Sequence, residues 1–424
     1  MPKTGSVPAP ADVDVRDGNC LGVVRPGHTI DKTMSISRRQ LIGATAAAAG
    51  TVAAGASGET QEVARSQSLD AIAKAKGRIG FGSFLNSFAR DPARSQGIPA
   101  DFDDIKVRDV HLRECGIVTA GVYWTWTRPN AQDFVFHNSD RVIDWAEQNK
   151  QKIRGHNLVW LRYDRMPDWL NNYDFGSRPA TEAERLLREH ITTFCKRYGT
   201  RIFSWDVVNE AIDPHTGLVR DDAFHKRLGD AVVDIAFDAA RQAAPHASLV
   251  YNDYMGWTDG SARHRDGVLK LLGRLKSQGL RVDMVGVQSH IGPGLIGDVM
   301  GNLDFNASEQ ANLKSFLDQV VSFGHRLSIT EFDVGESGLP PDNLARDHAL
   351  ADITRRYLQF MLSYPQLDYL ITWGMVDHHS WLQTRNMRED GALKRPTVYD
   401  PNYAPKLMRD VIADAFRTAP PGRN

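Results

Sequence analysis

Two glutamates at the ends of strand-like segments could together cleave a glycosidic bond. Glu210 follows an apolar run at 203–208 that ends in the amide of Asn209, as does a buried strand that delivers polar side chains to a cavity. Glu331 lies far along the chain, in a second apolar segment at 327–333. Two carboxyl groups on either side of one sugar ring are the minimum equipment for glycoside hydrolysis. The fold must therefore bring two distant strand ends together.

The elements that must position these glutamates alternate along the sequence. Apolar segments predict strands at 79–84, 117–123, 152–160, 202–209, 248–253, 283–290, 326–333 and 367–375. Helical periodicity lies among them, at 103–114, 141–150, 182–198, 223–244, 262–278, 309–323, 344–363 and 403–416. Eight strands alternating with eight helices over roughly 340 residues predict an α/β fold, the (β/α)8 TIM barrel, as a single domain at 65–424. A doubly wound open sheet is the competing fold.

Two observations favour closure into a barrel. No Gly-rich dinucleotide fingerprint follows the first strand, although an open cofactor-binding sheet often has one. Polar and aromatic residues gather at the C-terminal ends of several strands, and these ends share one mouth in a barrel. They are His156, Trp160, Asn209, Glu210, Gln288, His290, Glu331 and Trp373.

Residues 1–64 resemble a leader with a twin-arginine export signal. Met34 is a natural alternative start, and Arg38 and Arg39 precede an Ala-rich run at 43–57 with small residues where a peptidase could cut. We expect this segment to be removed and the chain to be exported, either to a periplasm or out of the cell. A short helix packed on the body and a membrane anchor are the alternatives. The run is too rich in Gly and Ala to span a bilayer well, so no stable membrane insertion is expected.

Composition narrows the class of partner. Lys and Arg total 51 against 52 Asp and Glu, for a net charge of -1, so nothing in the overall field favours nucleic acid. Nine Trp and eleven Tyr suit a polysaccharide partner, although aromatic residues also fill cores. We expect Cys115 and Cys195 to be buried thiols, and Cys20 to fall in the leader. A disulfide between Cys115 and Cys195 remains possible, and a monomer is expected.

Six short motifs in one order resemble glycoside hydrolase family 10, the β-1,4-xylanase family. Each comes at the end of a predicted strand, and together they cover nearly everything after the leader. They are GHNLVW at 155–160, WDVVNEA at 205–211, YNDY at 251–254, GVQSH at 286–290, ITEFD at 329–333 and WGMVDHHSW at 373–381. The resemblance implies a retaining double displacement, with Glu331 as nucleophile and Glu210 as general acid and base. The two carboxyl groups would then be roughly 5–5.5 Å apart.

The same resemblance implies supporting roles around this pair. Asn209 would hydrogen-bond a sugar hydroxyl or the carboxylate of the intermediate, Gln288 would bind substrate, and His290 would bind substrate and hold the nucleophile in orientation. His156 would bind a hydroxyl of the cleaved sugar. Trp160, Trp373 and Trp381 would wall that sugar, although we expect one of the three to be packing at the barrel top.

Other chemistries are disfavoured by spacing. Asp377, His378 and His379 cluster, but adjacent histidines rarely bind one ion and no partner at helical spacing completes a set. Ser289 and Ser380 lack a nucleophile elbow. We therefore expect neither a metal nor a cofactor.

The sequence departs from the family pattern in two places. After the second strand the family carries Glu-Asn and then Lys, which grip xylose units, where this chain has Gly121, Val122 and Thr125. After Trp160, Leu161 and Tyr163 replace the family's His and Gln. A site that hydrogen-bonds substrate hydroxyls discriminates strongly, so these losses leave the identity of the glycan open.

Arginines in the same loops suggest a hypothesis for that glycan. The residues concerned are Arg128, Arg162, Arg165 and Arg178, and guanidinium groups bind carboxylates in a bidentate manner. A uronate-containing polysaccharide is therefore one alternative to plain xylan; solvated surface arginines are the competing interpretation. An endo-acting β-1,4-glycanase of the xylanase type remains the leading hypothesis. A non-catalytic carbohydrate-binding protein is the alternative from another class, and the presence of both glutamates counts against it.

Overall fold

A computed structural model describes residues 67–88, 99–293, 302–385 and 387–423. The predicted leader, its arginine pair and Cys20 lie outside these residues. Cys115 and Cys195 are buried free thiols, as expected, and burial raises the pKa of Cys195 to about 12. Within the described residues no helix is long and apolar enough to cross a membrane.

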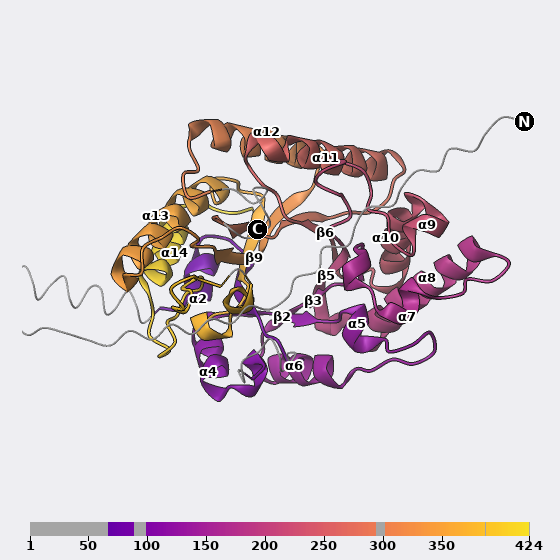
Figure 1. Ribbon diagram of the computed structural model, residues 1–424, viewed down its shortest axis with the longest axis horizontal. Helices are drawn as coiled ribbons and strands as arrows, with labels where there is room; N and C mark the ends of the chain where they lie inside the picture. The colour runs from indigo at the N-terminus through magenta and orange to yellow at the C-terminus, as the bar shows by residue number, and fades with distance from the viewer. Residues whose placement is uncertain (1–66, 89–98, 294–301, 386, 424) are drawn as a thin grey trace, which may run out of the picture. The chain divides into compact units, whose positions relative to one another are not determined.

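Parallel strands close into a barrel (Figure 1). The ring is β1 (Gly80–Phe84), β2 (Ile117–Gly121), β3 (Lys152–His156), β5 (Ile202–Asn209), β6 (Ser248–Asp253), β7 (Met284–Val287), β9 (Arg326–Val334) and β10 (Leu367–Thr372). Strand β10 pairs with both β1 and β9, which closes the ring and leaves no open edge. Two short strands, β4 (Val159–Trp160) and β8 (His290–Ile291), extend it by pairing with β5 and β9. The predicted (β/α)8 barrel is therefore confirmed, and the open sheet is wrong.

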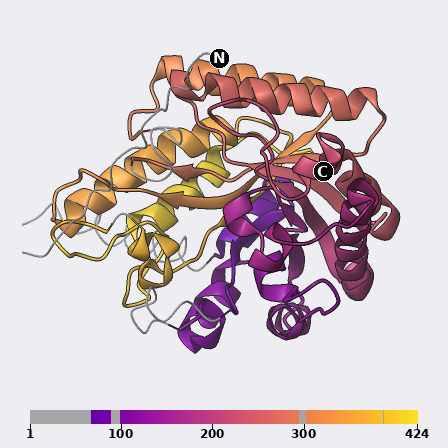
Figure 2. The same cartoon turned by 45° about the vertical axis from the view of Figure 1, so that its right-hand side comes forward.

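Helices cover the outside of the strand ring (Figures 1 and 2). The longer ones are α4 (Ile105–Glu114), α6 (His137–Gln148), α8 (Pro179–Tyr198), α10 (Ala231–Ala243), α11 (Ala262–Ser277), α12 (Ala307–Ser322), α13 (Asn343–Met361) and α14 (Leu407–Thr418). Shorter ones are α2 (Leu69–Ala75), α5 (Trp124–Thr127), α7 (Asp168–Asn171) and α9 (His225–Leu228). Short 3-10 turns lie at 101–103, 163–165, 199–201, 259–261, 377–379 and 381–384.

Some predicted boundaries were wrong for local reasons. The helix predicted at 223–244 is two helices, because Gly229 adopts a φ of 58° and ends α9. The last helix begins at Leu407 rather than at 403, after Pro405, since proline restricts the residue before it. The strands predicted at 152–160 and 283–290 are each interrupted before their last residues.

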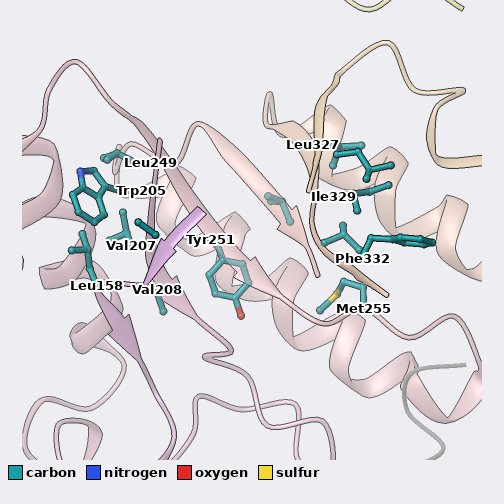
Figure 3. Close-up of a cluster of buried hydrophobic side chains, with 14 of the residues drawn as sticks. Leu158, Trp205, Val207, Val208, Leu249, Tyr251, Met255, Leu327, Ile329 and Phe332 are labelled. Carbon is teal, nitrogen blue, oxygen red and sulfur yellow. The ribbon is translucent and has the colours of Figure 1, made fainter. Parts of the chain in front are cut away.

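Alternation along the strands separates an outer core from the barrel interior. The side chains of Trp205, Leu249, Tyr251, Leu327 and Ile329 belong to the main apolar cluster (Figure 3). A second cluster consists of residues from four different strands, namely Ile117, Val250, Met284, Tyr369 and Ile371. Buried polar groups accompany it, since Arg154 is paired with Asp206 and neither side chain is exposed. The polar residues that follow on these strands lead to the cavity described next.

Candidate active site

One cavity of about 770 Å³ contains both candidate glutamates. It is lined by Phe84, Asn86, Phe88, Asp101, Tyr123, Thr125, Trp126, Trp160, Arg162, Asp164, Arg165, Glu210, Gln288, His290, Glu331, Trp373, His379, Trp381, Thr384 and Arg385. Seven of the nine residues singled out from sequence are in this lining. The other two, His156 and Asn209, are buried and contact the lining groups from below.

Glu210 follows the last residue of β5 and has a φ of 52°, a backbone conformation uncommon for a side chain of this kind. The backbone is held there because its N–H donates to Asn252 O at 2.9 Å and its carbonyl accepts from Arg220 at 2.9 Å. Its carboxyl group is bonded on both oxygens: Gln288 Nε2 donates to Oε1 at 3.0 Å, and Arg162 Nη1 donates to Oε2 at 3.2 Å. Glu210 is thus buried but partnered.

Glu331 lies within β9, and its carboxylate is surrounded by donors. Asn252 Nδ2 donates to Oε1 at 2.7 Å, and His290 Nε2 is 3.2 Å from Oε2. Burial alone would raise its pKa, but attraction to His156, the contact with His290 and the charge of Arg154 hold it below the ordinary value. Glu331 is therefore built to remain ionised.

His290 is held by a second carboxylate. Its Nδ1 is 2.8 Å from Asp333 Oδ1, and Trp381 Nε1 donates to Asp333 Oδ2 at 2.7 Å. Burial would lower the pKa of His290, but Asp333 and Glu331 together raise it above its usual range. The imidazolium form is thus favoured, and it donates to both carboxylates.

Side-chain amides connect the two glutamates. Asn252 Nδ2, bonded to Glu331, also donates to Asn209 Oδ1 at 2.8 Å. Gln288 Nε2 lies 3.3 Å from that same oxygen and bonds Glu210. Thr330 fixes Asn252 by donating to its Oδ1 at 2.6 Å. The carboxyl groups are thereby oriented by one rigid network of buried groups.

His156 lies at the base of the cavity, with only 1% of its surface exposed. Its Nδ1 is 2.6 Å from Asp206 Oδ2 and 3.9 Å from Glu331 Oε1. The rings of Tyr123 and Trp373 pack edge-on against it at 5.3 and 5.1 Å. It is absent from the cavity lining, so its expected contact with a sugar hydroxyl stays a prediction.

All three expected tryptophans line the cavity. Trp373 stacks on Phe84 with ring centroids 4.2 Å apart. Trp160 extends the wall beside Tyr123, at 5.8 Å, and Trp381 is fixed by its bond to Asp333. Which of the three contacts sugar, and which only packs at the barrel top, stays a prediction.

Aromatic residues occupy the wall where the sequence departs from the family pattern. Trp126 stacks on Phe88 at 4.3 Å and contacts Tyr123 edge-on at 4.6 Å. Thr125 also lines the cavity there, whereas Gly121 and Val122 are buried. This wall therefore offers ring faces where the family pattern has an acid, an amide and a lysine.

The four loop arginines separate into two groups. Arg162 and Arg165 line the cavity. Arg128 is fully buried and donates to the carbonyls of Leu186 and Ala131 and to Glu189, so it is neither in the cavity nor a solvated surface arginine. Arg178 is exposed beside a separate hollow formed within residues 173–182, which agrees with the surface interpretation.

Asp377 does not join the neighbouring histidines. It is buried, and it pairs with Lys406 at 2.8 Å. Asp104, His378 and His379 instead bring ligand-type atoms within 4.8 Å of one another. The Asp104 carboxylate already accepts from Tyr403 at 2.6 Å and lies 3.0 Å from His379 Nε2.

Comparison with known proteins identifies the class. The model of glycosyl hydrolase family 10 matches residues 68–415, and the chain belongs to this family. The predicted glycosidase is thereby confirmed. Endo-1,4-beta-xylanase B of Humicola insolens is 30% identical over 342 residues, which are 80% of this chain and 85% of that protein. Endo-1,4-beta-xylanase 3 of Hypocrea jecorina is 28% identical over 80% of this chain and 83% of that one.

Solved structures share the fold. Native xylanase 10B from Thermotoga maritima superposes with a TM-score of 0.66 at 27% identity, over 82% of this chain and 98% of that one. Native xylanase10C from Cellvibrio japonicus superposes with a TM-score of 0.71 at 25% identity, over 85% of this chain and 74% of that one.

Several residues that build the site were not assigned roles from the sequence. Asn252 and Asp333 stand in quoted motifs, and each follows the strand alternation that places polar groups inside. Asp206 carries the same signal, since it is the charged residue of a largely apolar strand. The sequence gives no signal for Arg385, because it lies in the loop after β10, where no strand or helix periodicity indicates the direction of its side chain.

Proposed function

We propose that this protein is a retaining endo-1,4-β-xylanase-type hydrolase that acts on xylan or a xylan-like polysaccharide. The observation that carries the proposal is the amide network that joins Glu210 to Glu331 within one aromatic-walled cavity. The names of the xylanase relatives support the substrate class.

Glu331 is the nucleophile in this proposal. Its oxygen bonds to the anomeric carbon while the glycosidic bond breaks, and protonated Glu210 gives its proton to the departing oxygen. In the second half, Glu210 takes a proton from water as the water oxygen bonds to the anomeric carbon and the ester to Glu331 breaks. The product keeps the β configuration.

The surroundings of the two carboxyl groups support this division. Glu331 has a lowered pKa and is held by His290 and Asn252; a nucleophile must be ionised. Glu210 is held by Gln288, a neutral donor, on one oxygen and by a loop arginine on the other. Asn209 and His156 complete the site from below, and Trp160, Trp373 and Trp381 offer ring faces to sugar.

Product analysis tests the proposal. We expect early-time NMR of xylan hydrolysis to show β-anomers first, with a rapid fall in polymer length. The variant Glu331→Ala should lose turnover yet still bind xylo-oligosaccharides. Initial α-products, or full turnover by this variant, would refute the mechanism.

The remaining expectations concern the chain outside the site. We propose that residues 1–64 are a leader, that the twin-arginine pathway exports the chain, that residues 65–424 form the mature enzyme and that this enzyme is a monomer. The arginine pair and the Ala-rich run support export. Replacing Arg38 and Arg39 by Lys should retain the precursor in the cytoplasm, and light scattering should give the mass of one mature chain.

A further inference from the structure

Three guanidinium groups share the cavity with the glutamates. Arg162 and Arg165 come from the segment after β4, and Arg385 comes from the loop after β10, more than two hundred residues away in the sequence. All three are partly buried. Two separate loops thus bring positive charge to one place.

The contacts of these arginines leave positive charge in excess. Arg162 forms a bidentate pair with Asp164, at 2.9 and 3.0 Å, in addition to its contact with Glu210. Arg165 lies over the Trp160 ring at 5.0 Å, with its Nε 3.5 Å from Asp164. Asp164 therefore serves two arginines at once. Glu210 is the other carboxylate in contact with this group, and the proposed reaction needs it protonated.

Arg385 is the least compensated of the three. Its guanidinium lies over Trp381 at 5.3 Å, and no carboxylate of the described residues is within the 4.0 Å of an ion pair. Burial lowers its pKa, and repulsion by Arg165 and Arg162 lowers it further, against a smaller opposing effect of the Glu210 and Asp164 charges. A half-buried cation held beside two others is costly unless an anion joins them.

Ordinary surface basicity does not account for this cluster. The chain as a whole is nearly neutral, at -1, so a local excess of cations is not a sample of a basic surface. Arg128 is an example of a structural arginine in this protein. Its guanidinium group donates hydrogen bonds to two backbone carbonyl groups and to Glu189. Arg162 is bonded to Asp164 and Glu210, whereas Arg165 and Arg385 are described by ring contacts and, for Arg165, one longer ion pair.

The reaction itself increases the imbalance. A protonated Glu210 no longer offers Arg162 an ion pair, so at the start of each cycle Asp164 is the carboxylate left in contact with Arg162 and Arg165. Two other acids are in the lining: Glu331 is held by His290 and Asn252, and Asp101 faces His379, at 3.4 Å from its Nδ1. An anion brought by the substrate would restore the balance at the step that needs Glu210 neutral.

We propose that Arg162, Arg165 and Arg385 bind the carboxylate of a uronic acid carried by the substrate, close to the cleaved bond. This inference rests on the proposed function and narrows its substrate to acidic β-1,4-linked glycans. The uronic acid is either a side group on xylan or a unit of the backbone, because both present the same carboxylate. Guanidinium groups match that anion in shape and charge.

A substrate pair that differs only in charge tests this. One member is a glucuronate-substituted xylo-oligosaccharide, and the other is the same compound after reduction of its carboxyl group to a primary alcohol. We expect kcat/KM for the acid to exceed that for the alcohol about tenfold, as for a charge-assisted contact in a partly shielded site. A third arm, an oligosaccharide with a backbone uronate, tells which source is preferred.

Matched variants locate the effect. Arg385→Gln should reduce the acid-to-alcohol ratio by roughly three- to tenfold, whereas Arg178→Gln, at an exposed arginine beside the other hollow, should leave the ratio as in the parent. If Arg385→Gln fails to fold, the salt dependence of the acid-to-alcohol ratio of the parent enzyme still tests the proposal. Raising NaCl from about 0.05 to 0.5 M should reduce its ratio at least twofold, because salt screens a half-exposed ion pair.

Three results would overturn the proposal: equal kcat/KM for acid and alcohol, preference for the alcohol, or a ratio that neither salt nor Arg385→Gln changes. These outcomes differ from failure of the proposed function. An enzyme that cleaves neither these compounds nor plain xylan is no xylanase, whereas one that cleaves both members equally is a xylanase without a carboxylate site.

Discussion

His290 offers the sharpest test of how the site keeps Glu331 ionised. Its imidazole stands between two buried carboxylates, 3.2 Å from Glu331 Oε2 and 2.8 Å from Asp333 Oδ1. The variant His290→Asn removes the positive charge and leaves both acids in place. Asp333 then retains its bond from Trp381, while Glu331 retains Asn252.

The expected loss follows from one charged hydrogen bond. Such a bond contributes about 1.5–3 kcal/mol, so kcat/KM should fall roughly 10- to 150-fold. The pH dependence should also change. His290 helps to lower the pKa of Glu331, so this pKa rises in the variant. Because the nucleophile must be ionised, the variant should lose activity at a higher pH than the parent as the solution is acidified.

An aryl xylobioside with a good leaving group is the proper substrate, since its cleavage depends little on the proton from Glu210. We expect kcat/KM, measured from about pH 4 to 8, to show the shifted acid limb. His264→Asn is the matched control, because His264 is equally buried and lies 3.4 Å from another carboxylate, Asp253. An acid limb that coincides with the parent's, or one that moves equally in the control, would refute this account of Glu331.

Three further predictions address the acid, the fold and the core. Glu210→Ala should slow xylan hydrolysis roughly 10²- to 10⁴-fold. Azide needs no general base, so it should restore turnover of the aryl xylobioside and give a β-glycosyl azide that NMR detects. Absence of this rescue would contradict the role of Glu210 as general base. Lys406→Met should lower the free energy of unfolding by about 3–5 kcal/mol and Tm by roughly 4–7 °C, because Asp377 stays buried without its cation. Adding Asp377→Asn should recover more than half of that Tm loss in calorimetry, and no recovery would argue against the pair. Gly155→Ala should destabilise the barrel by about 1–3 kcal/mol in urea unfolding, since a Cβ would lie 2.1 Å from the Trp205 ring; a neutral substitution would mean that this contact relaxes freely.

The strand and helix order was predictable because the barrel repeats one pattern. Each strand is an apolar run bounded by helical periodicity, and strand β5 was predicted with its observed ends, Ile202–Asn209. The predicted ends of helices were wrong where a single residue sets the boundary, as at Gly229 and Pro405. The glutamates were found because a charged side chain at the end of an apolar strand has few structural explanations.

The electrostatic surroundings of the site were less accessible from sequence. Arg154 and His156 both contact Asp206 because β3 pairs with β5, and the register of this pairing shifts near these residues. Loop residues were harder still, because their direction depends on packing. Arg128 and Arg162 both lie in segments that follow early strands, yet Arg128 is bonded to Glu189 inside the helical layer and Arg162 contacts Glu210.

The two catalytic candidates differ in what stands behind them, and this difference explains how identical side chains can take opposite roles. Glu331 is faced by groups on barrel strands: His290 at 3.2 Å and Asn252 at 2.7 Å, with His156 at 3.9 Å. Substrate cannot remove these, so its charge is fixed by the fold. The cation that contacts Glu210 is Arg162, a half-buried residue after β4. The positive charge beside Glu210 therefore comes from a loop, whereas that beside Glu331 comes from the barrel strands.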